Sequence, residues 1–115
     1  MQSNSNISRK VLLASNDNVL AALLPMLLAP TGYEVVTVAR GCYNKADAHL
    51  YDLLIIDGDP KINFDGSLPA VISVAPTNII GAYDKGVDLV VSKPLIAKVF
   101  IAKIRAILRR YGIEL

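Results

Sequence analysis

The sequence predicts an α/β protein: a three-layer α/β/α sandwich built on a five-stranded parallel sheet. Short apolar segments alternate with segments typical of helices along the 115 residues. Most of these segments are apolar without interruption, as expected for strands that helices cover on both faces. Two of them end at charged residues, since Asp57 closes one and Lys93 follows another. The carboxyl ends of parallel strands form one rim where ligands bind, so we expect Asp57 and Lys93 to lie there.

The first half of the chain is typical of two strand–helix units followed by a third strand. The polar cluster from Ser15 to Asn18 separates the first strand from the first helix, and Pro30 and Gly32 end that helix. β-branched residues favour the second strand. The expected elements are a strand at 11–14, a helix at 18–29, a strand at 33–38, a helix at 43–50 and a strand at 52–56.

The second half predicts a thin layer of helices on one side of the sheet. Residues 58–69 separate the third and fourth strands, which is near the minimum for a parallel crossover. Pro60, Gly66 and Pro69 leave room for little more than one helical turn, so the helix after strand three is reduced or missing. The remaining expected elements are a strand at 70–75, a short helix at 78–85 capped by Thr77, and a strand at 89–92.

The last helix, expected at 95–111, is the clearest element. Apolar residues recur at spacings of three and four, which predicts one buried stripe, and basic residues take a solvent-facing side. The stripe is Ile96, Phe100, Ile104, Ile107, Leu108 and Tyr111, and the basic residues are Lys98, Arg105 and Arg109.

Length and composition predict one domain at 9–115 after a disordered polar tail at 1–8. The tail lacks a signal-peptide pattern, and the longest uncharged apolar stretch, 19–30, is too short to span a bilayer. We therefore expect a soluble, cytoplasmic protein with no membrane partner. Cys42 is the only cysteine, which excludes an intramolecular disulfide and a cysteine zinc cluster. The net charge of +2 does not by itself imply a nucleic-acid partner.

Together these segments resemble the receiver domain of two-component response regulators, the CheY-like (flavodoxin-like) fold, from about residue 9 to residue 110. The resemblance rests on three stretches in order: 51–57 followed by Pro60 and Asp65-Gly66, then 86–94, then the helix that ends in Arg109-Arg110. It implies that Asp57 stands where a receiver accepts a phosphoryl group from a histidine kinase. It also implies that Lys93 stands where a lysine neutralises the phosphoryl oxygens.

The sequence departs from the receiver pattern where a divalent cation would bind. Carboxylate attack on a phosphoryl group brings like charges together, so the chemistry needs Mg²⁺. The resemblance implies an acidic pair after strand one, but Ser15 and Asn16 stand there. Three carboxylates and a lysine would carry about −2 and attract the cation, whereas Asp57 and Lys93 sum to zero and can pair.

Two further positions lack the side chains that the resemblance implies. The hydroxyl at the end of strand four falls on Val74, with Ser73 one residue early and therefore on the opposite face. The aromatic switch in strand five falls on Val90 or Val91.

Two other aspartates, Asp17 and Asp59, could replace the missing metal ligands. Asp17 follows the acidic-pair positions and Asp59 lies two residues past Asp57. Local chemistry favours a helix-start role for Asp17 and a turn role for Asp59. We therefore expect no cofactor, with Mg²⁺ bound only if Asp57 is a working phosphoacceptor.

The first helix is unusual because residues 19–28 carry no charge on any face. A helix on the surface of a layered fold normally has a polar stripe, so either a neighbour buries it or Pro25 bends it onto the core. We hypothesise an interface for a protein partner or a homodimer. The residues assigned to it are Leu20, Leu23, Leu24, Leu27, Lys98, Arg105 and Arg109.

These observations predict an atypical receiver, a pseudo-receiver, that is not an enzyme. It would act as a protein-interaction or dimerisation module in bacterial signalling or transcription regulation, independently of aspartyl phosphate. The first alternative is a working phosphoacceptor receiver that uses Asp57. The second is nucleic-acid binding through the basic last helix, although no aromatic side chains interleave with its basic residues and direct contact is not expected. The Arg-Arg ending resembles receivers that precede a DNA-binding output domain.

Overall fold

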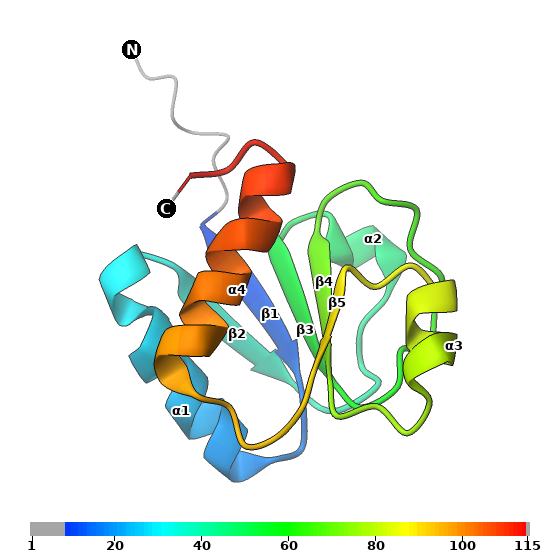
Figure 1. Cartoon of the computed structure of the whole chain (residues 1–115), viewed down its shortest axis with the longest axis horizontal. Helices are drawn as coiled ribbons and strands as arrows, with labels where there is room; N and C mark the ends of the chain where they lie inside the picture. The colour runs from blue at the N-terminus through cyan, green and yellow to red at the C-terminus, as the bar shows by residue number, and fades with distance from the viewer. Residues whose placement is uncertain (1–8, 115) are drawn as a thin grey trace.

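The computed structural model describes residues 9–114, and the predictions for the tail at 1–8 and for Leu115 lie outside these residues. Strands and helices alternate along the chain, except that β4 follows β3 without a helix between them (Figure 1). In order they are β1 (Lys10–Ala14), α1 (Asn18–Leu28) with a 3-10 turn η2 (Ala29–Thr31), β2 (Glu34–Val38), α2 (Lys45–Ala48), β3 (Leu53–Asp57), β4 (Ala70–Val74), α3 (Ile79–Asp84), β5 (Leu89–Val91) and α4 (Ala97–Arg110).

The five strands form one parallel sheet in the order β2-β1-β3-β4-β5. The register places the end of β1 beside the end of β3, since Ala14 pairs with Ile56. On the other side of β3, Asp57 pairs with Val74 at the end of β4. All carboxyl ends therefore meet at one rim, and the predicted fold class is confirmed.

Alternation along the strands separates two apolar layers. In β3, Leu53 and Ile55 pack with α1 and α4, whereas Leu54 and Ile56 pack on the face that carries α3. Figure 1 shows α1 and α4 side by side on one face of the sheet, with α2 and α3 away from them. The central strands are buried on both sides, which explains their continuous apolar sequence.

The layer with α2 and α3 is thin, as predicted. These helices have four and six residues, and residues 58–69 form no helix. Phe64 fills part of the missing layer: its side chain packs on the apolar cluster and its N–H donates to the Lys85 carbonyl at 2.7 Å. Gly86 permits this approach, because a Cβ there would lie 2.2 Å from the Phe64 oxygen.

Three local predictions are wrong. The second helix covers 45–48 rather than 43–50, and Asn44 caps it. Asn78, not Thr77, caps α3, because its Oδ1 accepts from the Gly81 N–H. Ile96 is 65% exposed, because its backbone is extended and its side chain therefore leaves the buried stripe of α4.

Helix α1 has one buried face despite its lack of charge. Leu20, Leu24 and Leu28 pack in the core at 4%, 0% and 1% exposure. The prediction that Leu20 and Leu24 face a partner is therefore wrong, because their side chains already contact the sheet. Val19 and Met26 are the exposed large apolar residues of this helix, each at 73%. None of the helices within 9–114 is long and apolar enough to cross a membrane.

Candidate functional site at the rim of the sheet

Asp57 lies at the rim with both carboxylate oxygens engaged. The residue is 8% exposed. Ser15, from the turn after β1, donates its hydroxyl to Oδ2 at 2.8 Å. The ammonium of Lys93, from the segment after β5, lies 3.1 Å from Oδ1. The predicted pairing of Asp57 with Lys93 is confirmed.

Lys93 makes a second ion pair, with Asp17, that the sequence did not predict. Its Nζ lies 3.0 Å from Asp17 Oδ2. Asp17 Oδ1 accepts from the N–H groups of Val19 and Leu20 at 2.9 and 3.2 Å, so the predicted helix-start role is confirmed. The Lys93 ammonium thus joins the segment after β5 to the start of α1, 76 residues away in sequence.

The ion pair shifts the titration of both partners. The hydrogen bond from Lys93, followed by that from the Leu20 N–H, lowers the pKa of Asp17. The hydrogen bond to Asp17, followed by that to Asp57, raises the pKa of Lys93. Both groups therefore hold their charges at neutral pH, and Lys93 is a permanent cation beside Asp57.

Asp59 is engaged elsewhere. Its Oδ2 accepts from the Thr77 hydroxyl at 2.6 Å and its Oδ1 accepts from the Asn78 N–H at 3.1 Å. The Thr77 hydroxyl, first among its partners, lowers the pKa of Asp59. Asp59 fastens the turn before α3, and it takes no part in the Asp57–Lys93–Asp17 network.

The chain is similar in structure to several solved proteins at low sequence identity. A two-component response regulator from Clostridium difficile gives a TM-score of 0.72 at 22% identity, covering 90% of this chain and 98% of that one. A CheY-like receiver domain protein from Methanospirillum hungatei gives 0.68 at 17% identity, covering 88% and 94%. The receiver domain of a sensor histidine kinase from Pseudomonas aeruginosa, with a magnesium ion in its active-site cleft, gives 0.68 at 17% identity, covering 87% and 97%.

This chain has the receiver fold. The fold part of the resemblance is therefore confirmed. No protein-family model matches the sequence, and no curated protein matches it significantly.

Within this receiver fold, the end of β4 offers no hydroxyl to Asp57. Val74 is fully buried in the core beside α1 and α4. Ser73 donates its hydroxyl to the Gly58 carbonyl at 2.6 Å, and its neighbour Val74 faces the other layer, as the alternation predicts. At β5, the Val90 N–H donates to the Tyr83 hydroxyl at 3.1 Å. An aromatic ring thus stands beside β5, but it comes from α3.

Sequence reasoning missed Arg40 as a second cation at the rim. Its guanidinium lies over Gly58, where a Cβ would meet it at 2.2 Å, and its charge helps to lower the pKa of Asp59. Its backbone N–H donates to Asn16 Oδ1 at 3.0 Å, which fixes the loop after β2 against the turn after β1. No sequence motif marks Arg40, because only the folded chain brings its side chain next to Gly58, the residue after Asp57.

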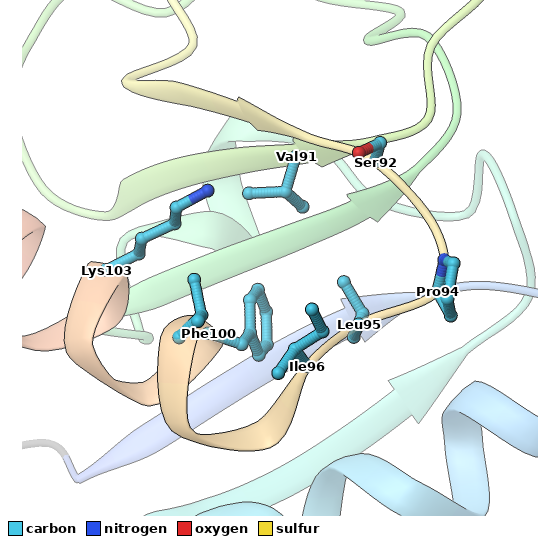
Figure 2. Close-up of a pocket in the computed structure, with 8 residues that line it drawn as sticks. Val91, Ser92, Pro94, Leu95, Ile96, Phe100 and Lys103 are labelled. Carbon is cyan, nitrogen blue, oxygen red and sulfur yellow. The ribbon is translucent and has the colours of Figure 1, made fainter.

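A small hollow of about 110 Å³ lies beside the rim, between β5 and the start of α4. Figure 2 shows Leu95, Ile96 and Phe100 along it, with Lys103 at one end and Pro94 at the other. Apolar side chains dominate this hollow. Its polar members, Ser92 and Lys103, include no carboxylate, imidazole or thiol that would hold a metal.

Proposed function

We propose that this chain is an atypical receiver domain that works without aspartyl phosphate, as a non-enzymatic protein-interaction module in bacterial signal transduction. The observation that carries the proposal is the position of Lys93, whose ammonium bridges Asp57 and Asp17 at 3.1 and 3.0 Å. Binding of a partner or a second copy, rather than phosphorylation, then supplies the regulatory input.

The residues around Asp57 do not fit a magnesium ion. Magnesium requires near-octahedral oxygen ligands at about 2.0–2.1 Å, normally including carboxylates. Next to Asp57 are a neutral hydroxyl from Ser15 and an ammonium from Lys93. The Asn16 side-chain oxygen already accepts a hydrogen bond from the backbone N–H of Arg40. Within 9–114, no three side chains of His, Cys, Asp or Glu gather closely enough to hold a metal.

One observation favours the alternative of a working phosphoacceptor. Asp17 and Asp57 each direct an oxygen at the same cation, the Lys93 ammonium. If Lys93 turned away, these two carboxylates would be left facing a common space. A magnesium ion would then have to replace the ammonium, against the repulsion of the nearby Arg40 guanidinium.

The deciding experiment is a titration of the ¹⁵N-labelled full chain with magnesium chloride and then with beryllofluoride, followed by NMR. We expect no saturable shifts at the amides around Asp57 up to about 10 mM Mg²⁺, well above the dissociation constants of ordinary millimolar sites. The matched control is Ser15→Asp with Asn16→Asp, which restores two carboxylates and should bind Mg²⁺ saturably. Saturable shifts around Asp57 in the unmodified chain would support the phosphoacceptor alternative instead.

A further inference from the structure

A groove runs between α1 and α4, which lie side by side on one face of the sheet (Figure 1). Its first part, about 380 Å³, lies beside Lys93 and is lined by Val19 and Leu23 of α1 and by Pro94 and Leu95. Its second part, about 420 Å³, follows one turn further along both helices. Met26 and Leu27 face Ile101, Lys98 and Arg105 there. We call this surface the α1–α4 groove.

The floor of the α1–α4 groove is apolar and uncovered in the isolated chain. Val19, Leu23, Met26 and Leu27 recur at spacings of three and four along α1, so they form a row beside the buried leucines. Val19 and Met26 are each 73% exposed. A continuous apolar row that is open to solvent marks a protein-interaction site.

The charges that flank the groove are positive. Lys98 and Arg105 are seven residues apart on α4, so they stand on one side of the helix about 10 Å apart. Helix α1 contains no charged residue, and α4 contains no acidic one. The carboxylate of Asp17, in the first part of the groove, is already paired with Lys93. Neither Lys98 nor Arg105 has an ion pair among residues 9–114.

We propose that the α1–α4 groove takes an acidic amphipathic helix of a partner protein, a proposal that rests on the interaction role argued above. Apolar side chains at spacings of three and four would fill the row on α1, the usual mode of a helix bound in a groove. Carboxylates seven residues apart would face Lys98 and Arg105.

A second copy of this chain fits the groove poorly. A twofold dimer through this surface would place one basic flank in the same small interface as another, without carboxylates to neutralise them. Basic charge without interleaved aromatic side chains would also suit duplex DNA, but the apolar floor would then stay exposed. The charge pattern and the apolar row together favour the acidic helix.

The test uses two synthetic helical peptides with the same leucine pattern, one with glutamates on its flanks and the other with lysines. Each is titrated into the ¹⁵N-labelled full chain. We expect the glutamate peptide to bind about tenfold more tightly, since two flank pairs change from attraction to repulsion. The shifts should be confined to residues 19–27 and 94–105. Equal affinities, or shifts centred on another face, would overturn the proposal.

Reversing the two charges of the protein provides a more specific test of the groove. Lys98→Glu with Arg105→Glu should make the chain prefer the lysine peptide. The control is Lys103→Glu with Arg110→Glu, which makes the same charge change at the same spacing on a different side of α4 and should keep the original preference. If the control reverses the preference as well, net charge and not the groove decides binding, and the proposal is wrong.

Two further readouts separate the other occupants. Concentration-dependent shifts in the groove without peptide, with a dimer in sedimentation, would identify a second copy as the occupant and overturn the proposal. Salt-dependent binding of duplex DNA at Lys98 and Arg105 that excludes the glutamate peptide would do the same. None of these measurements involves Asp57 or magnesium. If the peptide experiments fail, the proposal of a phosphate-independent role is not affected. If magnesium binds saturably, the peptide experiments still test the groove.

Discussion

Ser15 donates its hydroxyl hydrogen to Asp57 Oδ2 at 2.8 Å, from a position where the receiver resemblance implies an acidic residue. A second carboxylate at this point would repel Asp57 and attract a cation, whereas the hydroxyl satisfies the Asp57 oxygen directly. The same hydroxyl oxygen accepts from the Asp17 N–H at 2.9 Å. A single neutral side chain thus connects the buried carboxylate to the start of α1.

Replacing Ser15 by alanine should destabilise the fold. Hydrogen bonds to charged groups contribute about 1.5–3 kcal/mol, and Asp57 is too buried for water to replace the lost donor fully. We expect a loss of that order in the free energy of unfolding, measured by urea denaturation. The control is Ser67→Ala, whose exposed hydroxyl donates to Asp65 and should change stability by less than about 0.5 kcal/mol. Equal losses of unfolding free energy in the two variants would show that the Ser15–Asp57 hydrogen bond stabilises the fold no more than an exposed one.

Acid should weaken the fold through Asp17. Its folded-state pKa is lowered below the ordinary value of 3.8, first by Lys93 and then by the Leu20 N–H. The resulting stabilisation is present above pH 3.8 and is lost as the pH falls through the lower, folded-state value. We expect Asp17→Asn to be less stable at neutral pH and to show a shallower loss of stability below pH 4. Parallel acid profiles for the two proteins would contradict the ion pair.

Alkali should weaken the fold through Tyr111. Burial, and then its hydrogen bond to Asp88 at 2.8 Å, raise the pKa of Tyr111 to about 12. The neutral phenol is favoured in the folded state, so its stabilisation is present below pH 10 and is lost between pH 10 and 12. Tyr111→Phe should remove this part of the alkaline loss. Its ultraviolet titration should also lack one late-ionising phenol, and an unchanged titration would disprove the shift.

Alanine substitutions on the two sides of α1 should separate its core face from its groove face. Leu24→Ala should cost about 2–5 kcal/mol of unfolding free energy, because Leu24 is fully buried against the sheet. Met26→Ala should cost less than about 0.5 kcal/mol, because its side chain is mostly in solvent. Thermal and urea unfolding of both variants checks this. A large loss with Met26→Ala would mean that the groove side also supports the fold.

The sequence predicts the central strands β1, β3 and β4 well because burial on both faces leaves a continuous apolar run. It predicts α1 only in part, because a helix without charge gives no contrast between its inner and outer faces, and Leu24 and Met26 look alike in such a pattern. Ile96 was misplaced for a related reason: the apolar spacing begins at Ile96, one residue before the helical backbone of α4.

At the rim, Asp57 and Lys93 were predictable because Asp57 ends one apolar strand and Lys93 stands shortly after another. The Asp17–Lys93 pair and the approach of Arg40 to Gly58 were not, since they join segments whose proximity only the completed sheet determines. The N–H groups at the start of α1 already explain an aspartate at position 17. The sequence therefore gave no reason to expect a distant lysine as a second partner of Asp17.

Lys93 borders both the rim and the first part of the α1–α4 groove. No substitution of this lysine can therefore change one surface and spare the other, and a defect in a Lys93 variant has two explanations from the start. Genetic dissection has to use residues that belong to one surface alone, Ser15 for the buried carboxylate and Lys98 for the groove.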